Sequence, residues 1–396
     1  MSSVETTESG KKKNEVNRNA TSNSNQDDDE YGDVLELDCD LRGLHLTQPR
    51  CEAGSQGVQR AVPAKMHTTT PCIHSLELSD IAKRPVYLKL ENCQATGSFK
   101  DRGIGHCIKQ AFLRGHTRVI AISAGNAGLA AAHAATTLGM PVSVVVPSTT
   151  LNLLVSRLKR EGADVMVHGD TLKQSTVFGT EMAAANDAFL AHPYDHPDIW
   201  EGHATLVEEL KEQLPTRPAV IVTAVGGGGL IKGVLLGLEK VGWADSVATV
   251  GMETEGTACF NASKKAGKIV SLPEGAMKSI ARSIAVHRPA AALENDLKNP
   301  LVFSDVVSDT QAVHALCRFA DDHRFLVEPA AGAALAFVYS GLVHNLIKNR
   351  AIPWTPESPV VIVVCGGNSV TLDLIDEWKR RFLSNNNNGV NNNDKH

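Results

Sequence analysis

The chain has 396 residues, of which 42% are hydrophobic and 21% are charged, the balance of an ordinary globular protein. Its formal net charge of -5 argues against a nucleic acid or an anionic membrane surface as a partner, because both attract basic proteins. At about 100–200 residues per domain, this length predicts two domains.

The cysteines and histidines form no recognisable metal or disulfide pattern. None of the eight cysteines belongs to a C-x-x-C pair, and the histidines contain no H-E-x-x-H. No apolar run approaches the ~20 residues that span a bilayer, and the N-terminus lacks the apolar core of a secretory signal. We therefore expect a cytoplasmic protein that has neither a membrane nor a nucleic-acid partner.

Both ends of the chain are polar and low in complexity. Residues 1–60 are predicted to form a mostly disordered tail, in which VLELDCDL at 34–41 permits one extra strand. The asparagine-rich residues 384–396 are predicted to form a second disordered tail.

Between the tails, strand and helix patterns alternate along the chain. The apolar, β-branched runs predict strands at 119–123, 141–147, 163–169, 218–225, 247–253 and 359–365. The intervening periodic segments predict helices at 127–139, 153–162, 230–242, 308–324 and 371–382. This order predicts an α/β fold with open parallel sheets that are covered by helices on both faces.

Three polar, glycine-bearing loops follow predicted strands, where open α/β sheets bind their ligands: SAGNAG at 123–128, GGGG at 226–229 and CGGNS at 365–369. The GGGG loop opens a helix, so its N–H groups and the helix dipole suit a phosphate. Ile231 stands where a dinucleotide loop needs glycine, and Lys232 is not followed by the serine or threonine of a P-loop. The simpler alternative is a tight turn that needs positive φ.

Lys100 lies in the turn-prone stretch QATGSFKDRGIGH, residues 94–106. A solvated surface lysine is the ordinary interpretation of such a residue. A phosphate site without a nucleotide signature, together with a lysine in a glycine-bearing loop, favours pyridoxal phosphate instead. This cofactor needs a lysine for its covalent attachment and a cradle for one phosphate monoester.

Six motifs occur in an order and spacing that resemble one known family: ENCQATGSFKDRG, SAGNAGLAAA, VGGGGL, METEG, VEPAAGAAL and VVCGGN. Together they are similar to the L-serine/L-threonine dehydratases, which belong to the fold-type II pyridoxal-phosphate enzymes. The resemblance runs from about residue 64 to residue 382. It implies a homodimer whose cofactor lies in the cleft between two domains, a large one of residues 61–93 plus 197–383 and a small one of residues 94–196.

The resemblance also implies roles for matching positions. Lys100 would be the catalytic residue, as covalent anchor and general base, with Phe99 packed by the cofactor ring and Cys365 at the pyridine nitrogen. The phosphate would be held by Gly226, Gly227, Gly228, Gly229 and Leu230. The substrate carboxylate would meet Ser123, Ala124, Gly125, Asn126 and Ala127, and Asn126 would donate to the cofactor O3′. A monovalent cation, K⁺, would be surrounded by Glu253 and the carbonyls of Gly226, Thr257, Ile284 and Val286.

The implied reaction is β-elimination on a small amino acid, which converts L-serine to pyruvate and L-threonine to 2-oxobutyrate with release of ammonia. A serine racemase, a threonine synthase-like enzyme and an inactive pyridoxal-phosphate-binding protein remain as alternatives. Asp101 favours the second of these, because SFKDRG is typical of threonine synthase and hence of a phosphorylated substrate. Glu328, which precedes Pro329, either orients the neighbouring loop or has no role, and it is assigned no catalytic role.

Overall fold

The computed structural model describes residues 62–273, 275–349 and 355–384. The two predicted tails, apart from Ser384, and the candidate strand at 34–41 lie outside the described residues.

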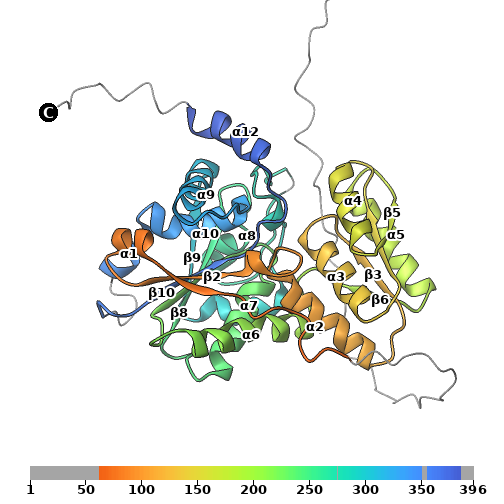
Figure 1. The fold of residues 1–396 in the computed structure, drawn as a ribbon, viewed down its shortest axis with the longest axis horizontal. Coiled ribbons are helices and arrows are strands. Elements are labelled where there is room, and N and C mark those ends of the chain that lie inside the picture. The colour runs from red at the N-terminus through yellow and green to blue at the C-terminus, as the bar shows by residue number, and fades with distance from the viewer. Residues whose placement is uncertain (1–61, 274, 350–354, 385–396) are drawn as a thin grey trace, which may run out of the picture.

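The described residues form two sheets, which Figure 1 shows in separate lobes of the molecule. The six-stranded sheet has the order β1-β2-β10-β7-β8-β9 and the four-stranded sheet the order β5-β4-β3-β6. The strands of the larger sheet are β1 (Cys72–Ser75), β2 (Val86–Leu90), β7 (Val220–Ala224), β8 (Ala248–Thr254), β9 (Val302–Val307) and β10 (Val360–Val364). Those of the smaller sheet are β3 (Val119–Ile122), β4 (Val142–Val146), β5 (Asp164–Val167) and β6 (Phe189–Ala191).

The α/β fold predicted from the sequence is confirmed, with one exception in the larger sheet. All strand pairs are parallel except β1 and β2, which run antiparallel with Cys72 opposite Lys89. The smaller sheet is parallel throughout. The chain passes from β1 to β2 through the short helix α1 (Leu76–Ala82), and such a short connection suits an antiparallel neighbour better than a parallel crossover.

Helices cover both sheets. They are α2 (Lys100–Leu113), α3 (Asn126–Thr137), α4 (Asn152–Arg160), α5 (Leu172–Ala185), α6 (Pro197–Gln213), α7 (Gly229–Lys240), α8 (Cys259–Ala266), α9 (Asp309–His323), α10 (Pro329–Tyr339), α11 (Leu342–Lys348) and α12 (Leu372–Phe382). Short 3₁₀ helices lie at Glu91–Cys93, Arg282–Ile284, Ala291–Leu293 and Asp296–Lys298. Helix α9 begins at its Ser308 cap with a capping box to Gln311, which agrees with the predicted start.

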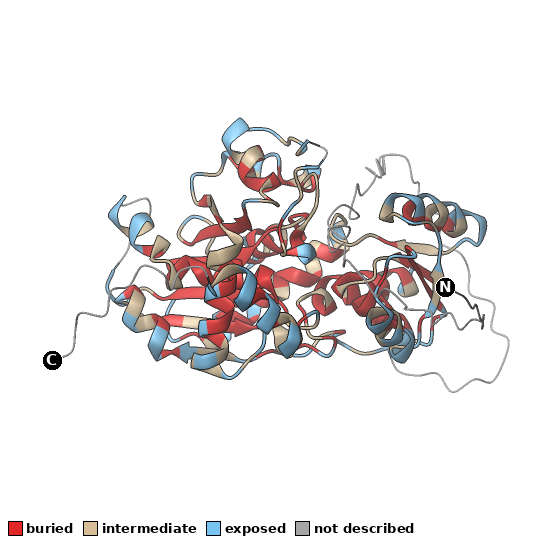
Figure 2. Cartoon of the chain, turned by 90° about the horizontal axis from the view of Figure 1, so that it is seen from above, coloured by how far each residue is buried: buried red, intermediate tan, exposed pale blue. Residues whose placement is uncertain are grey.

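Figure 2 shows that the buried residues occupy the interior of both lobes and that exposed residues line the outer helices. The central strands β7, β8 and β10 are buried along their whole length, as expected for parallel strands with helices on both faces. No single helix among the described residues has the length and apolarity to cross a membrane; α10 and α11 pass that test only as a pair, which is bent by 51°.

Helix α2 lies between the two sheets, packed on α6 of the larger lobe and α3 of the smaller one. A buried ionic network, which we call the Arg102 cluster, fixes its first turn. Arg102 donates to Glu91 at 2.7 Å and to Glu209 at 2.7 Å, and Lys89 donates to Glu209 at 2.6 Å. Because α2 begins at Lys100, this cluster holds the helix that carries the candidate catalytic lysine.

Candidate active site

The loop before Lys100 is bound through its backbone to the loop after β10. Phe99 N donates to the Cys365 carbonyl at 3.0 Å, and Gly367 N donates to the Gly97 carbonyl at 3.0 Å. An isolated antiparallel bridge joins Ser98 to Gly366 between these two bonds. Two motifs far apart in the sequence therefore form one rigid piece at the carboxyl edge of the larger sheet.

Asp101 stabilises this loop through hydrogen bonds within it. Its buried carboxylate accepts from the backbone N–H of Thr96 at 2.9 Å and from the Thr96 hydroxyl. Burial raises the pKa of Asp101, although the hydrogen bonds from Thr96 act in the opposite direction. The sequence signal that favoured a phosphorylated substrate thus has a structural explanation in the shape of the loop.

The Lys100 side chain is partly buried between the two lobes. Its Nζ donates to the Pro193 carbonyl and lies 5.2 Å from the centroid of the Phe99 ring. Burial lowers the pKa of Lys100 to about 8, against the opposing influence of Glu328 and Cys365. A lysine with this pKa exposes a useful fraction of neutral, nucleophilic amine near neutral pH.

Cys365 follows directly on β10 and is 1% exposed. Burial raises the pKa of its thiol well above the ordinary value, so the side chain is held as a neutral thiol. A neutral thiol suits a neutral ring nitrogen, as the resemblance implied for this position.

The GGGG loop joins β7 to α7 and fits a phosphate. The backbone N–H groups of Gly226, Gly227, Gly228 and Gly229 find no acceptor within the described residues, and they lie at the start of a helix. Leu230, the next residue, is buried. Unpaired donors at a helix N-terminus are the arrangement that binds phosphate groups.

The tight-turn alternative explains only one of the four glycines. Gly228 has φ of +87°, which favours glycine. The others are required by close neighbours: a Cβ on Gly227 would lie 2.3 Å from the Tyr194 ring, and one on Gly226 would lie 2.8 Å from Ile284 Cα. The loop is therefore packed closely enough that side chains are excluded from it.

The SAGNA loop leads from β3 into α3. Ser123 follows the strand, and its hydroxyl accepts from Gly125 N at 3.2 Å. Ala124 is partly buried, while Asn126 and Ala127 are buried in the first turn of α3. The N-terminus of α3 thus faces the interdomain region, where its dipole favours a carboxylate.

Asn126 is held by Glu328, and its donation to the cofactor O3′ stays a prediction. Its Nδ2, expected to donate to a cofactor oxygen, donates to both carboxylate oxygens of Glu328 at 3.1 Å. Its Oδ1 is buried and finds no partner among the described residues. The reason is that a carboxylate only accepts, so the amide must turn its N–H groups toward Glu328.

Glu328, for which the sequence left open an orienting role in the neighbouring loop, has partners that the sequence did not indicate. It is 2% exposed and accepts further hydrogen bonds from Ser283 at 2.8 Å and Ser369 at 2.9 Å. The VEPAAG motif shows a glutamate before a helix-starting proline, but nothing local in the sequence indicates these distant partners.

The residues expected around a cation gather near the start of α8. Glu253, buried on β8, accepts from Phe260 N at 2.8 Å and from Asn261 N at 2.7 Å. Cys259 N donates to the Thr257 carbonyl at 2.9 Å, and its thiol points to the Gly226 carbonyl at 3.6 Å. Ile284 packs against Gly226, and the partly buried Val286 follows two residues later. Burial raises the pKa of Glu253 to about 8.

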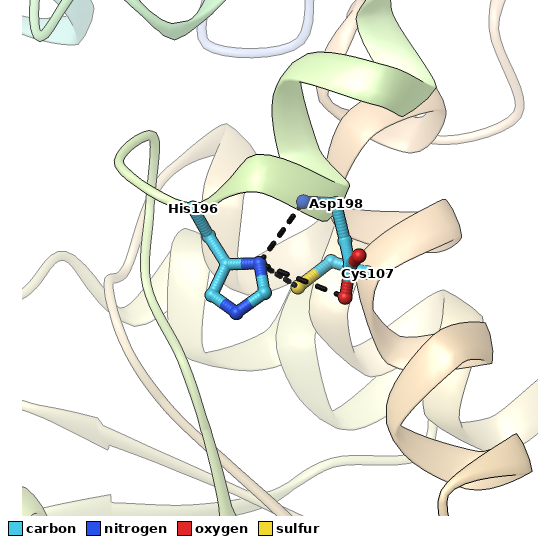
Figure 3. Close-up of side chains that lie close together, drawn as sticks. All are labelled: Cys107, His196 and Asp198. Atoms are coloured by element: carbon cyan, nitrogen blue, oxygen red, sulfur yellow. Dashed lines mark hydrogen bonds and ion pairs between the residues drawn. The ribbon is translucent and has the colours of Figure 1, made fainter. Parts of the chain in front are cut away.

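A second group of side chains, Cys107, His196 and Asp198, lies where α2 meets the start of α6 (Figure 3). His196 Nδ1 is 3.5 Å from Cys107 Sγ and 3.7 Å from Asp198 Oδ2. That nitrogen already accepts from Asp198 N at 3.1 Å, Asp198 is paired with Arg114, and burial raises the pKa of Cys107. These contacts identify the group as the N-cap of α6 and give no support to a metal centre.

Comparisons with known proteins agree with this geometry. Residues 64–366 match the family described as pyridoxal-phosphate dependent enzyme. A "serine dehydratase-like" protein of Rattus norvegicus is 46% identical over 84% of this chain and 99% of its own length. An "L-serine dehydratase/L-threonine deaminase" of Bos taurus is 47% identical over 80% of this chain and 96% of its own length.

Solved structures show the same likeness. The fungal L-serine ammonia-lyase from Rhizomucor miehei superposes with a TM-score of 0.74 at 33% identity, covering 80% of this chain and 99% of that one. Maize serine racemase superposes with a TM-score of 0.70 at 26% identity, covering 81% of this chain and 94% of that one.

Proposed function

This chain belongs to the pyridoxal-phosphate dependent enzymes, and from that premise we propose that it is an L-serine and L-threonine ammonia-lyase. The substrates are supported by the relatives at 44–47% identity, which include proteins named L-serine dehydratase/L-threonine deaminase. The observation that carries the reaction class is Lys100, a partly buried amine of lowered pKa between a phosphate-binding loop and a buried thiol.

The residues present fit the cofactor. The Gly226–Gly229 loop would hold its phosphate, Lys100 would anchor it covalently, Phe99 would pack by its ring and Cys365 would face the ring nitrogen. When bound, pyridoxal phosphate supplies the electron sink that makes the substrate α-proton removable.

Residues of the chain itself orient the substrate and transfer its protons. The backbone N–H groups of Asn126 and Ala127 at the N-terminus of α3, with the hydroxyl of Ser123, would orient the substrate carboxylate. Lys100 Nζ, freed by the incoming amino group, takes the α-proton as general base, because its pKa of about 8 lies near the working pH. The β-hydroxyl then leaves as water with the proton returned by the Lys100 ammonium, and the unsaturated product is hydrolysed by a water molecule to the 2-oxo acid and ammonia.

A coupled assay for 2-oxo acid tests this proposal. The purified full-length protein, supplied with pyridoxal phosphate, should release pyruvate from L-serine and 2-oxobutyrate from L-threonine. Interconversion of serine enantiomers without 2-oxo acid would instead support the racemase alternative, to which the likeness to maize serine racemase lends weight. Turnover of O-phosphohomoserine alone would support a threonine synthase-like enzyme.

We also propose K⁺ as a structural cofactor, bound near Glu253 and the backbone of Gly226, Thr257, Ile284 and Val286. The burial of Glu253 and the close approach of Gly226 to Ile284 support it. Replacing K⁺ by tetramethylammonium should lower the activity, and Glu253→Gln should abolish the difference between the two salts. Glu255→Gln, an exposed neighbour, serves as the control. Equal activity in both salts for the native protein would contradict this proposal.

A homodimer and a cytoplasmic location complete the proposal. The homodimer follows from the family resemblance, and light scattering of the eluting protein should give twice the chain mass of 42.3 kDa. The free thiols at Cys72, Cys93 and the other described cysteines agree with a reducing compartment. Microscopy of a fluorescent fusion tests the location.

A further inference from the structure

Glu328 joins three separate parts of the chain at the site. Its carboxylate receives the amide of Asn126 from the smaller lobe, the hydroxyl of Ser283 from a 3₁₀ helix and the hydroxyl of Ser369 from the loop after β10. Its own backbone N–H donates to the Gly366 carbonyl at 3.1 Å. These contacts bridge the two lobes directly beside Cys365 and Lys100.

The chemistry of these contacts is one-sided. The side-chain groups that hydrogen-bond to Glu328 here are all neutral, an amide and two hydroxyls, and each is able to donate to its carboxylate. The side chain is 2% exposed, whereas Ser283 and Ser369 are exposed. The Glu328 carboxylate is thus shielded from water, and its hydrogen-bond partners Ser283 and Ser369 connect it to the interdomain region.

The orientation of Asn126 follows from this arrangement. With Nδ2 held by both carboxylate oxygens, Oδ1 is presented as an unpaired, buried acceptor. Without a fixed acceptor at this place, either end of the amide could face the site. Glu328 therefore decides which hydrogen-bonding group Asn126 offers to a bound molecule.

We propose that Glu328 is a positioning residue of the active site, which fixes the amide of Asn126 and ties the smaller lobe to Ser283 and Ser369 around Lys100. The proposal depends on the proposed function only in placing Lys100 at the centre of the site. A carboxylate in this place also has a measurable effect, since its charge raises the pKa of Lys100 against burial.

Three full-length variants distinguish the effect of the hydrogen bonds made by Glu328 from the effect of its negative charge. Glu328→Ala removes both. Glu328→Gln keeps the size and can keep the link, because the serine hydroxyls can reverse their donor role, but it removes the charge. Ser369→Ala, the control, removes one link and keeps the charge.

The first measurement is the affinity for pyridoxal phosphate, by absorbance titration of cofactor-stripped protein. We expect Glu328→Ala to bind about tenfold or more weakly, because three hydrogen bonds to a charged group are lost, and Glu328→Gln to stay within about threefold of the native protein. Native affinity in Glu328→Ala would overturn the proposal.

The second measurement is the pH midpoint for acetylation of Lys100 in the cofactor-stripped protein, read by mass spectrometry. The charged or titratable groups near Lys100 are Glu328, Cys365, His192 and His203. Glu328→Gln should lower the midpoint by about one pH unit, while Ser369→Ala should leave it unchanged.

An unchanged midpoint in Glu328→Gln would overturn the proposal even where Glu328→Ala fails to fold. Neither measurement involves turnover, so a failed ammonia-lyase assay would leave both results standing as they are.

Discussion

Three buried carboxylates near Lys100 fall into two groups, one of which is paired with cations and the other with neutral hydrogen-bond donors. In the Arg102 cluster, the carboxylates of Glu91 and Glu209 are met by the cations of Arg102 and Lys89. At Glu328, the donors are an amide and two hydroxyls. Both groups lie near Lys100, because Arg102 follows it in the first turn of α2 and Glu328 raises its pKa.

This difference in partners distinguishes the carboxylates that stabilise the fold, Glu91 and Glu209, from Glu328, which acts on the candidate active site. The carboxylates of the Arg102 cluster are paired with buried cations and contribute by holding α2 in place. A carboxylate paired with neutral donors keeps its field, which acts on the nearest titratable groups. Of these carboxylates, Glu328 is the one that raises the pKa of Lys100 against burial.

The largest effect on activity is expected from Lys100→Ala, which removes the amine whose pKa Glu328 raises. Activity should fall on the order of 10³-fold or more, because the general base is lost. The absorbance band of the bound cofactor near roughly 410–420 nm should disappear. Turnover assays and spectra check this, and persistent 2-oxo acid production would contradict the role of Lys100.

Arg102→Met should give the largest loss of stability. It leaves Glu91 and Glu209 without their shared partner, so we expect the free energy of unfolding to fall by about 3–5 kcal/mol. Denaturant unfolding measures this, with Arg102→Lys as the control that keeps one charge. A loss below about 1 kcal/mol would show that the cluster does not hold the fold.

The same substitution in both groups sharpens the contrast. Glu209→Gln leaves two cations undercompensated and should destabilise the protein by about 3 kcal/mol. Glu328→Gln should change stability by less than about 1 kcal/mol, because its neutral partners can rearrange. Denaturant unfolding of both variants measures these changes. Equal losses of unfolding free energy would show that the two groups do not differ in their contribution to stability.

The smallest effect is expected in the pH dependence of stability at acidic pH, to which Glu209 contributes. Although burial acts against it, hydrogen bonds from His67 and Arg102 hold the pKa of Glu209 well below its ordinary 4.5. The unfolded chain therefore binds the proton first, and the stability contributed by Glu209 is present above about pH 4.5 and lost as the pH falls.

Glu209→Gln should accordingly show a shallower fall of unfolding free energy below pH 4.5 than the native protein. The difference should be at most about 1.4 kcal/mol per pH unit, the value for one proton. Identical slopes would mean that Glu209 titrates alike in both states.

Much of this architecture could be predicted from the sequence, because its signals are local. The β-branched runs predicted β3, β4, β7, β8 and β10, and the three glycine loops lie at the carboxyl ends of β3, β7 and β10. Lys100 stood out through its neighbours Gly97 and Phe99 and through a phosphate loop without a nucleotide signature.

The rest depends on contacts between distant residues. Glu328 meets Asn126 across 202 positions of sequence, and Arg102 meets Glu209 across 107. The edge strand β1 is four residues long and too short to show a period. Asp101, whose partner Thr96 is only five residues away, was misleading for another reason: its motif suggested a substrate where the structure shows a loop.

The backbone link between Phe99 and Cys365 has a consequence for how this site can change over time. The carbonyl of Cys365, not its side chain, receives the N–H that places Lys100. In the proposed site, the side chain that faces the ring nitrogen can therefore be exchanged: we expect serine or alanine at position 365 to alter the electronics of the bound ring without displacing the lysine. Reaction preference and the placement of the anchor can thus evolve independently at one and the same residue.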